Sequence, residues 1–96
     1  MNKKEFERLY AEQNFIIDNN EFDADEYEAV KEIAKANNLN KYVLVTNNCE
    51  LDAIYVYCTD VETAVNAILT SITYINSPDE TTEFIENYIK SNIYTA

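Results

Sequence analysis

The segment from Lys41 to Thr59, KYVLVTNNCELDAIYVYCT, contains two runs rich in β-branched and aromatic residues, at positions 41–46 and 51–59. Residues of these kinds favour extended strands. Asn47-Asn48 stands between the runs, and asparagine tolerates the positive φ angles of a tight turn better than other non-glycine residues. The sequence therefore predicts an antiparallel β-hairpin in the middle of the chain.

The predicted two-residue turn sets the pairing of the hairpin, and it places Leu44 opposite Leu51. In this register Tyr55 and Tyr57 share one face with Tyr42. A two-stranded sheet is only marginally stable, so we expect helices to cover one of its faces. The tyrosine-bearing face is expected to stay open, and an exposed aromatic patch favours a homodimer or a partner-binding site.

Two amphipathic helices are expected before the hairpin, at about 2–18 and 23–36, because apolar residues recur there at helical spacing. The start of the second helix is marked by Asp23 and by Glu26 three residues later, which together form a capping box. The Asn37-Asn38 pair is the expected end of this helix.

Two more helices are expected after the hairpin. One is opened by a capping box of Thr59 and Glu62, and its apolar stripe includes Val61. The other begins at Ser77-Pro78, a cap followed by proline in the first turn, and its inward positions extend to Ile93. The predicted fold class is therefore α+β in the order ααββαα, with a central antiparallel β-hairpin packed against helices. The chain has 96 residues, which predicts a single domain over 1–96.

The chain is strongly acidic, with 18 Asp and Glu against 7 Lys and Arg and a net charge of −11. Seven of the carboxylates lie between Glu12 and Glu28, where there is no Lys or Arg. Nucleic acids and anionic membranes would be repelled by this charge, so we expect a basic partner, no direct nucleic-acid binding and no membrane contact. The chain has no apolar run long enough to span a bilayer and no signal-peptide pattern, which predicts the cytoplasm of a bacterial host.

The residue types that most catalytic and metal sites need are missing or poorly placed. Histidine and glycine are absent, which removes the commonest general base and the glycine-rich phosphate loops. Cys49 and Cys58 have acidic surroundings and point to opposite faces of the hairpin, so we expect two unreactive, reduced thiols. An EF-hand loop that starts at Asp18 would have Asp23 where glycine is required. We therefore expect a protein that is not an enzyme and binds no cofactor or metal ion.

We interpret the carboxylates as an imitation of the DNA backbone. A domain of this size spans on the order of 30 Å, a length over which duplex DNA presents roughly 18 phosphates. The predicted function is a DNA-mimic inhibitor that occupies the DNA-binding surface of a basic host protein, either the histone-like nucleoid protein HU or a defence nuclease or CRISPR effector. The acids expected to bind this partner are Asp18, Glu21, Asp23, Asp25, Glu26 and Glu28, followed by Glu50, Asp52, Glu83 and Glu86.

In size, acidity, lack of catalytic residues and an Asn-, Ile- and Tyr-rich composition, the whole chain resembles the small acidic proteins with which bacteriophages take over a host. Several such proteins are DNA mimics: antirestriction proteins, uracil-DNA glycosylase inhibitors, some anti-CRISPR proteins and HU inhibitors. The resemblance implies inhibition of a host protein, and it assigns no site residue.

Three alternatives stay open from the sequence. An adaptor or regulator would dock through the tyrosine-bearing hairpin face instead of through the acids. A purely solubilising role would give the acids no partner. An enzyme would need a cleft lined by two or three carboxylates, and no pair of acids is singled out for that role.

Overall fold

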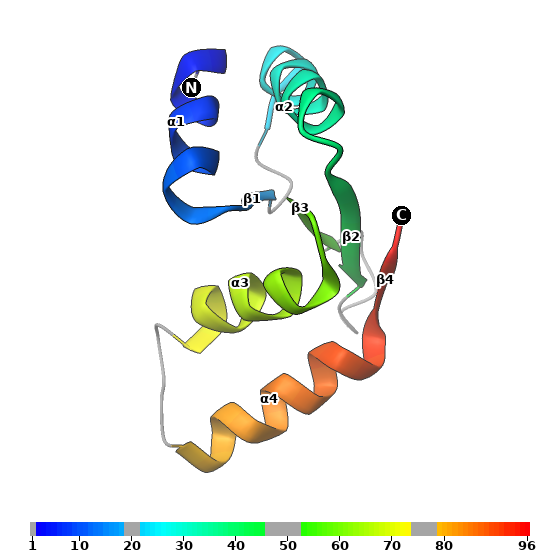
Figure 1. The fold of residues 1–96 in the computed structure, drawn as a ribbon. Helices are drawn as coiled ribbons and strands as arrows, with labels where there is room; N and C mark the ends of the chain where they lie inside the picture. The colour runs from blue at the N-terminus through cyan, green and yellow to red at the C-terminus, as the bar shows by residue number, and fades with distance from the viewer. Residues whose placement is uncertain (1, 19–21, 46–52, 74–78) are drawn as a thin grey trace.

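A four-stranded antiparallel sheet runs through the middle of the computed structural model, which describes residues 2–18, 22–45, 53–73 and 79–96 (Figure 1). Strands β2 and β3 are the predicted hairpin pair, and β1 and β4 extend it at its two edges. The order across the sheet is β1 (Ile16–Asp18), β3 (Ala53–Cys58), β2 (Asn40–Val45) and β4 (Ile93–Thr95).

The predicted α+β class is confirmed. Two helices precede the hairpin, α1 (Lys3–Gln13) and α2 (Ala24–Ala36), and two follow it, α3 (Val61–Thr73) and α4 (Asp79–Asn92). The order of helices and central strands is therefore the predicted ααββαα, with two short strands added to it.

The two helix pairs cover opposite faces of the sheet, so the fold has three layers (Figure 1). On one face, α3 and α4 pack on a core that includes Leu44 and Val56. On the other face, α1 and α2 pack on a second core that includes Ile16 and Tyr57. Neighbouring residues of a strand point to opposite faces, so Val56 and Tyr57 enter different cores.

The predicted register of the hairpin is wrong by three positions. Leu44 lies opposite Ile54, and Tyr42 lies opposite Val56. An odd shift exchanges the two faces of one strand relative to the other. The observed register puts Leu44, Ile54 and Val56 together in one apolar core, and that burial outweighs the preference for a two-residue turn. The predicted turn at Asn47-Asn48 lies outside the described residues.

The prediction of an open, tyrosine-bearing face is also wrong, for the same reason. Tyr57 is only 3% exposed beneath the first helix pair, and Tyr55 packs against the same core. Tyr42 is buried in the opposite core, under α3 and α4. The patch on which the homodimer was predicted does not exist, so a homodimer stays a prediction that needs a different surface.

The sequence pattern placed both edge strands inside helices. Helix α1 ends at Gln13 because Asn14 adopts a left-handed conformation, with φ of 66°. Ile16 then pairs with Tyr57 and is completely buried, which gives it more apolar contact than an exposed helical turn would. Ile93 similarly leaves the last helix and pairs with Leu44.

The predicted helix caps agree with the structure better than the predicted strand register does. The Asp23 capping box is confirmed: the Glu26 N–H donates to Asp23 Oδ1 at 2.8 Å, and the Asp23 N–H donates to Glu26 Oε1 at 3.2 Å. Helix α3 is capped one residue later than predicted, by Asp60, whose Oδ1 accepts from the Thr63 N–H at 2.8 Å. The predicted cap at Ser77-Pro78 lies outside the described residues.

Candidate functional site

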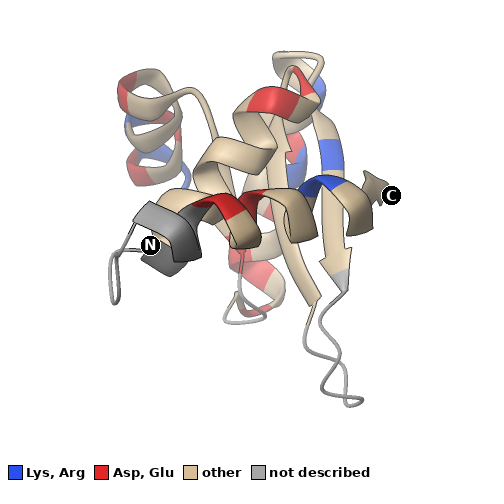
Figure 2. Cartoon of the chain, turned by 90° about the horizontal axis from the view of Figure 1, so that it is seen from below, with Lys and Arg blue, Asp and Glu red and all other residues tan. Residues whose placement is uncertain are grey.

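The acids predicted to bind a partner lie on both sides of the sheet. Asp23, Asp25, Glu26 and Glu28 belong to the cap and first turns of α2, whereas Glu83 and Glu86 belong to α4. Figure 2, viewed from the side of α4, shows acidic positions on that helix in front and on other helices behind it. The fold therefore does not bring all the predicted residues onto one surface.

Four of the ten predicted residues are either buried or outside the described residues. Glu21, Glu50 and Asp52 lie outside the described residues. Asp18 is only 6% exposed, because β1 turns its side chain toward the core that contains Tyr57. Its burial follows from the strand that the sequence pattern missed.

Helix α2 carries the denser group of acids. Asp23 and Glu26 hold each other in the capping box. Asp25 and Glu28 are exposed and three residues apart, so they lie on one side of the helix. Within the part of the chain that the structure describes, no Lys or Arg lies at ion-pair distance from either of them. Glu32 continues the same side and forms an exposed ion pair of 3.3 Å with Lys3 of α1.

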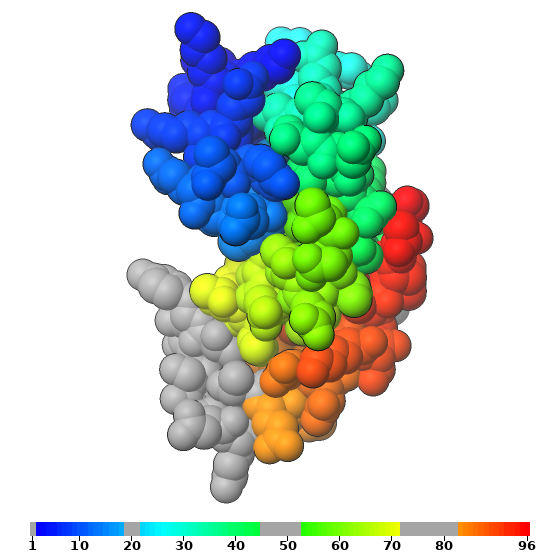
Figure 3. Space-filling view, viewed as in Figure 1, coloured from blue at the N-terminus to red at the C-terminus, as the bar shows by residue number. Residues whose placement is uncertain are grey.

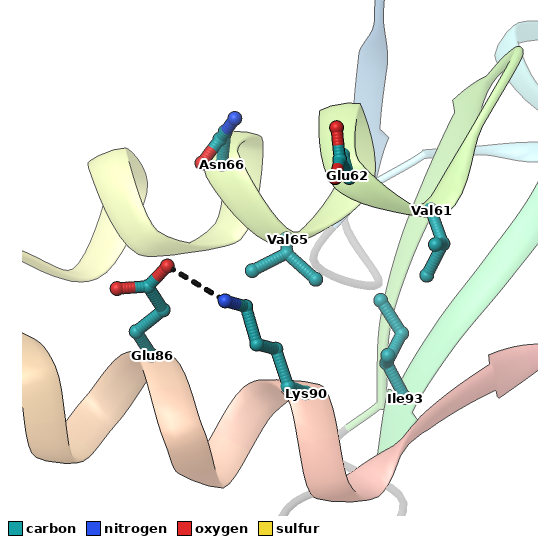
Figure 4. Close-up of a pocket in the computed structure, with 7 residues that line it drawn as sticks. All are labelled: Val61, Glu62, Val65, Asn66, Glu86, Lys90 and Ile93. Atoms are coloured by element: carbon teal, nitrogen blue, oxygen red, sulfur yellow. Dashed lines mark ion pairs between the residues drawn. The ribbon is translucent and has the colours of Figure 1, made fainter.

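A groove of about 530 Å³ lies between α3 and α4 near the start of β4 (Figure 4). Lys90 and Glu86 point from α4 toward α3 and form an i,i+4 ion pair of 3.0 Å. Val61 is 45% exposed in this groove, although its spacing had predicted an inward position. The lining is apolar from Val61, Val65 and Ile93 and polar from Glu62, Asn66, Glu86 and Lys90.

A cluster of tyrosines surrounds Lys41 on the face of the sheet under α2. The Lys41 Nζ atom lies 4.5 Å from the ring centroid of Tyr55, 5.1 Å from that of Tyr27 and 5.7 Å from that of Tyr57. It also donates a hydrogen bond of 3.1 Å to the Tyr27 hydroxyl, and this bond lowers the pKa of Tyr27 below its usual value. Figure 3 shows α2 packed beside α1. We call Lys41, Tyr27, Tyr55 and Tyr57 the lysine–tyrosine cluster.

Sequence reasoning missed the lysine–tyrosine cluster because of the register. The predicted pairing would place Lys41 opposite Ile54, whereas the observed pairing places it opposite Tyr57. The available signal was the single cation in an otherwise apolar strand segment. A cation on a strand that is covered on both faces needs a partner, and the tyrosine rings and hydroxyl provide it.

The Cys58 thiol has no features of a nucleophile. It is completely buried and free, and its Sγ lies 3.2 Å from the Asp60 carbonyl oxygen, which accepts the weak hydrogen bond. Burial raises the pKa of Cys58 to about 11, so the reactive thiolate is scarce at neutral pH. Cys49 lies outside the described residues.

Two absences hold for the residues that the structure describes. None of their His, Cys, Asp and Glu side chains gather in a group of three that would hold a metal ion. None of their helices is both long and apolar enough to cross a membrane.

Comparison of the chain with known protein families, with curated proteins and with solved structures finds no match in any of the three.

Proposed function

We propose that this protein inhibits a basic DNA-binding protein of a bacterial host by presenting carboxylates where that protein expects phosphates. The observation that carries the proposal is the exposed acidic side of α2. Asp25 and Glu28 have no cation at ion-pair distance among the described residues, so their charges are available to a partner. Such an inhibitor acts in the cytoplasm, where its target meets DNA.

The charge density of α2 narrows the class of target. Its 13 residues span roughly 20 Å, and a duplex of that length presents roughly 12 phosphates. The helix and its cap carry fewer carboxylates, and Lys31 and Lys35 offset some of them. A target that binds DNA through backbone charge and shape, such as HU, tolerates this lower density of negative charge better than a target that recognises specific bases. A nuclease or CRISPR effector with a cationic groove is the second class.

The burial of Tyr57 counts against the rival proposal of an adaptor that docks through the tyrosine-bearing hairpin face. Its side chain is only 3% exposed and packs in the core beneath α1 and α2, so it offers no open aromatic face on which a partner protein could dock. The acidic side of α2 requires no such rearrangement.

The proposal is tested by competition between this protein and DNA for purified HU. A fluorescent duplex bound to HU should be released as the protein is added, and the anisotropy of the duplex should fall. The affinity should decrease at least about tenfold between roughly 50 and 300 mM salt, because exposed charge pairs are screened. Binding that leaves the duplex in place, or that ignores salt, excludes DNA mimicry of this target.

The position of the contact is tested with a matched pair of double variants. Asp25→Asn with Glu28→Gln removes two charges from α2, and Glu83→Gln with Glu86→Gln removes two from α4, on the other face of the sheet. We expect the first pair to weaken binding roughly 3- to 20-fold, as for two exposed ion pairs, and the second to change it less than twofold. Equal losses from both would mean that net charge alone drives the association.

A further inference from the structure

A pocket of about 400 Å³ lies beside α2, where this helix passes over β2 and β3. Three of the seven cations of the chain line it: Lys31, Lys35 and Lys41. The two acids that also line it are Glu28 and Glu32, and Glu32 is already paired with Lys3. The electrostatic potential in the pocket is therefore locally positive, although the net charge of the protein is −11.

The net negative charge does not cancel this local field. Exposed charges are largely screened beyond about 8 Å at physiological ionic strength. An anion inside the pocket therefore interacts mainly with the charges that line it, which are three lysines and two glutamates. Long-range repulsion slows its approach more than it weakens its bound state.

Lys41 is the best-positioned cation of the pocket. The rings of Tyr27, Tyr55 and Tyr57 lie within 5.7 Å of its Nζ atom, so the side chain is already ordered. An ammonium has three hydrogen-bond donors, and across the described residues Lys41 uses one of them, to Tyr27. The remaining donors have no hydrogen-bond acceptor among the described residues, and the ordering of the side chain by the three rings lowers the entropy cost of binding one.

The Tyr57 hydroxyl is a second, independent indication of a ligand. The side chain lines the pocket and is 3% exposed. Over the described ranges its hydroxyl is a buried side-chain oxygen that no hydrogen bond of normal geometry satisfies. Burial, followed by the nearby Tyr27 side chain, raises its pKa. A buried hydroxyl without a partner costs about 1–3 kcal/mol, and such groups in native proteins usually meet a water molecule or a ligand.

We propose that this pocket binds a small organic oxyanion, a phosphate monoester or a carboxylate carried on an apolar body, through Lys41 and the Tyr57 hydroxyl. The oxyanion accepts from the free donors of Lys41 and from the Tyr57 hydroxyl. The apolar body lies against Ala34 and the tyrosine rings. The volume is in the range of small-molecule sites and exceeds what an inorganic anion fills. This proposal does not require the inhibition of a DNA-binding protein, although the pocket shares Glu28 with the acidic side of α2.

The test is an NMR titration of the full chain with phenyl phosphate, benzoate, inorganic phosphate and benzyl alcohol. We expect saturable shifts of the backbone amides of Lys41 and Tyr57 with the first two, at millimolar affinity or better. Inorganic phosphate and the neutral alcohol should bind at least about tenfold more weakly, a difference of about 1.4 kcal/mol. The ratio of phenyl phosphate to benzoate affinity identifies the preferred oxyanion. The absence of saturable shifts, or equal binding of benzyl alcohol, overturns the proposal.

Tyr57→Phe separates a binding role of the hydroxyl from a structural one. This variant keeps the ring in the core and should weaken phenyl phosphate binding at least threefold while its urea unfolding midpoint stays the same or rises. Lys35→Gln should weaken binding about two- to fivefold, whereas Lys4→Gln, on α1 and outside the pocket, should leave it unchanged. Unchanged affinity in Tyr57→Phe, or an equal loss in Lys4→Gln, contradicts the proposed site.

Discussion

The ammonium of Lys41 lies 3.1 Å from the hydroxyl oxygen of Tyr27, and this contact joins the central strand β2 to helix α2. The same ammonium lies over the ring of Tyr55 on the neighbouring strand β3. One side chain thus connects three elements of the fold in the layer between the sheet and α2. A charge in this position is stabilised by the aromatic rings and by a hydroxyl acceptor, since no carboxylate pairs with it among the described residues.

Replacement of Lys41 should return the pKa of Tyr27 toward 10.0, its ordinary value. The hydrogen bond from Lys41 and its positive charge both favour the phenolate, and Lys41→Met removes both. The measurement is an NMR pH titration of the labelled tyrosine rings. Lys4→Met, which removes an exposed cation from α1, is the matched control and should leave the Tyr27 titration in place. A Tyr27 pKa that is the same in the parent and in Lys41→Met would show that the contact does not persist in solution.

The protein should lose stability at alkaline pH through Cys58 and Tyr57. Burial raises the pKa of Cys58 from 9.0 to about 11, so the folded state holds this proton more tightly than the unfolded state does. The resulting stabilisation is complete below pH 9 and is lost as the pH rises to about 11. Tyr57, whose pKa is also raised, adds a loss that begins near pH 10.

Urea unfolding at pH 8 and at pH 11 measures this loss of stability. The variants Cys58→Ala and Tyr57→Phe show which of the two buried groups causes it. Cys58→Ala and Tyr57→Phe should each show a smaller decrease in unfolding free energy between the two pH values than the parent chain. The lowered pKa of Tyr27 acts in the opposite direction, because its stabilisation is present above pH 10. If both variants lose as much stability as the parent, neither buried group controls the alkaline transition.

Asp23 and Asp25 are two residues apart, and we expect them to contribute differently to the stability of the folded protein. Asp23→Ala removes the side chain that accepts from the Glu26 N–H, and it should lower the unfolding free energy by about 0.5–2 kcal/mol. Asp23→Asn keeps an acceptor and should lose much less. Asp25→Ala removes an exposed charge outside the box and should stay within about 0.5 kcal/mol of the parent. Urea denaturation of the three variants decides this, and equal effects at both positions would argue against the capping box.

The register of the central hairpin predicts a specific set of short proton–proton distances. NMR spectra should contain backbone cross-strand contacts that link Leu44 with Ile54 and Tyr42 with Val56. The register set by a two-residue turn predicts contacts between Leu44 and Leu51 instead. Spectra with the second set would place Tyr55 and Tyr57 on the α3–α4 face and would remove the lysine–tyrosine cluster.

Much of the local structure could be predicted from the sequence because its causes lie within a few residues. The Asp23 capping box and the end of α2, where Asn37 is the cap and Asn38 has φ of 54°, depend on side chains next to the backbone they affect. The net charge and the acid density of residues 12–28 follow directly from composition. The α+β class follows from the alternation of helical and extended patterns along the chain.

Tertiary structure alone decided the register, the edge strands and the positions of the candidate sites. Ile16 pairs with Tyr57, and Ile93 pairs with Leu44, so each edge strand depends on a residue about 40 to 50 positions away. Such pairings are selected by the total apolar area that the whole fold buries, a quantity that no local pattern contains. The burial of Asp18, the separation of the acids onto two helices and the cluster around Lys41 all follow from that selection.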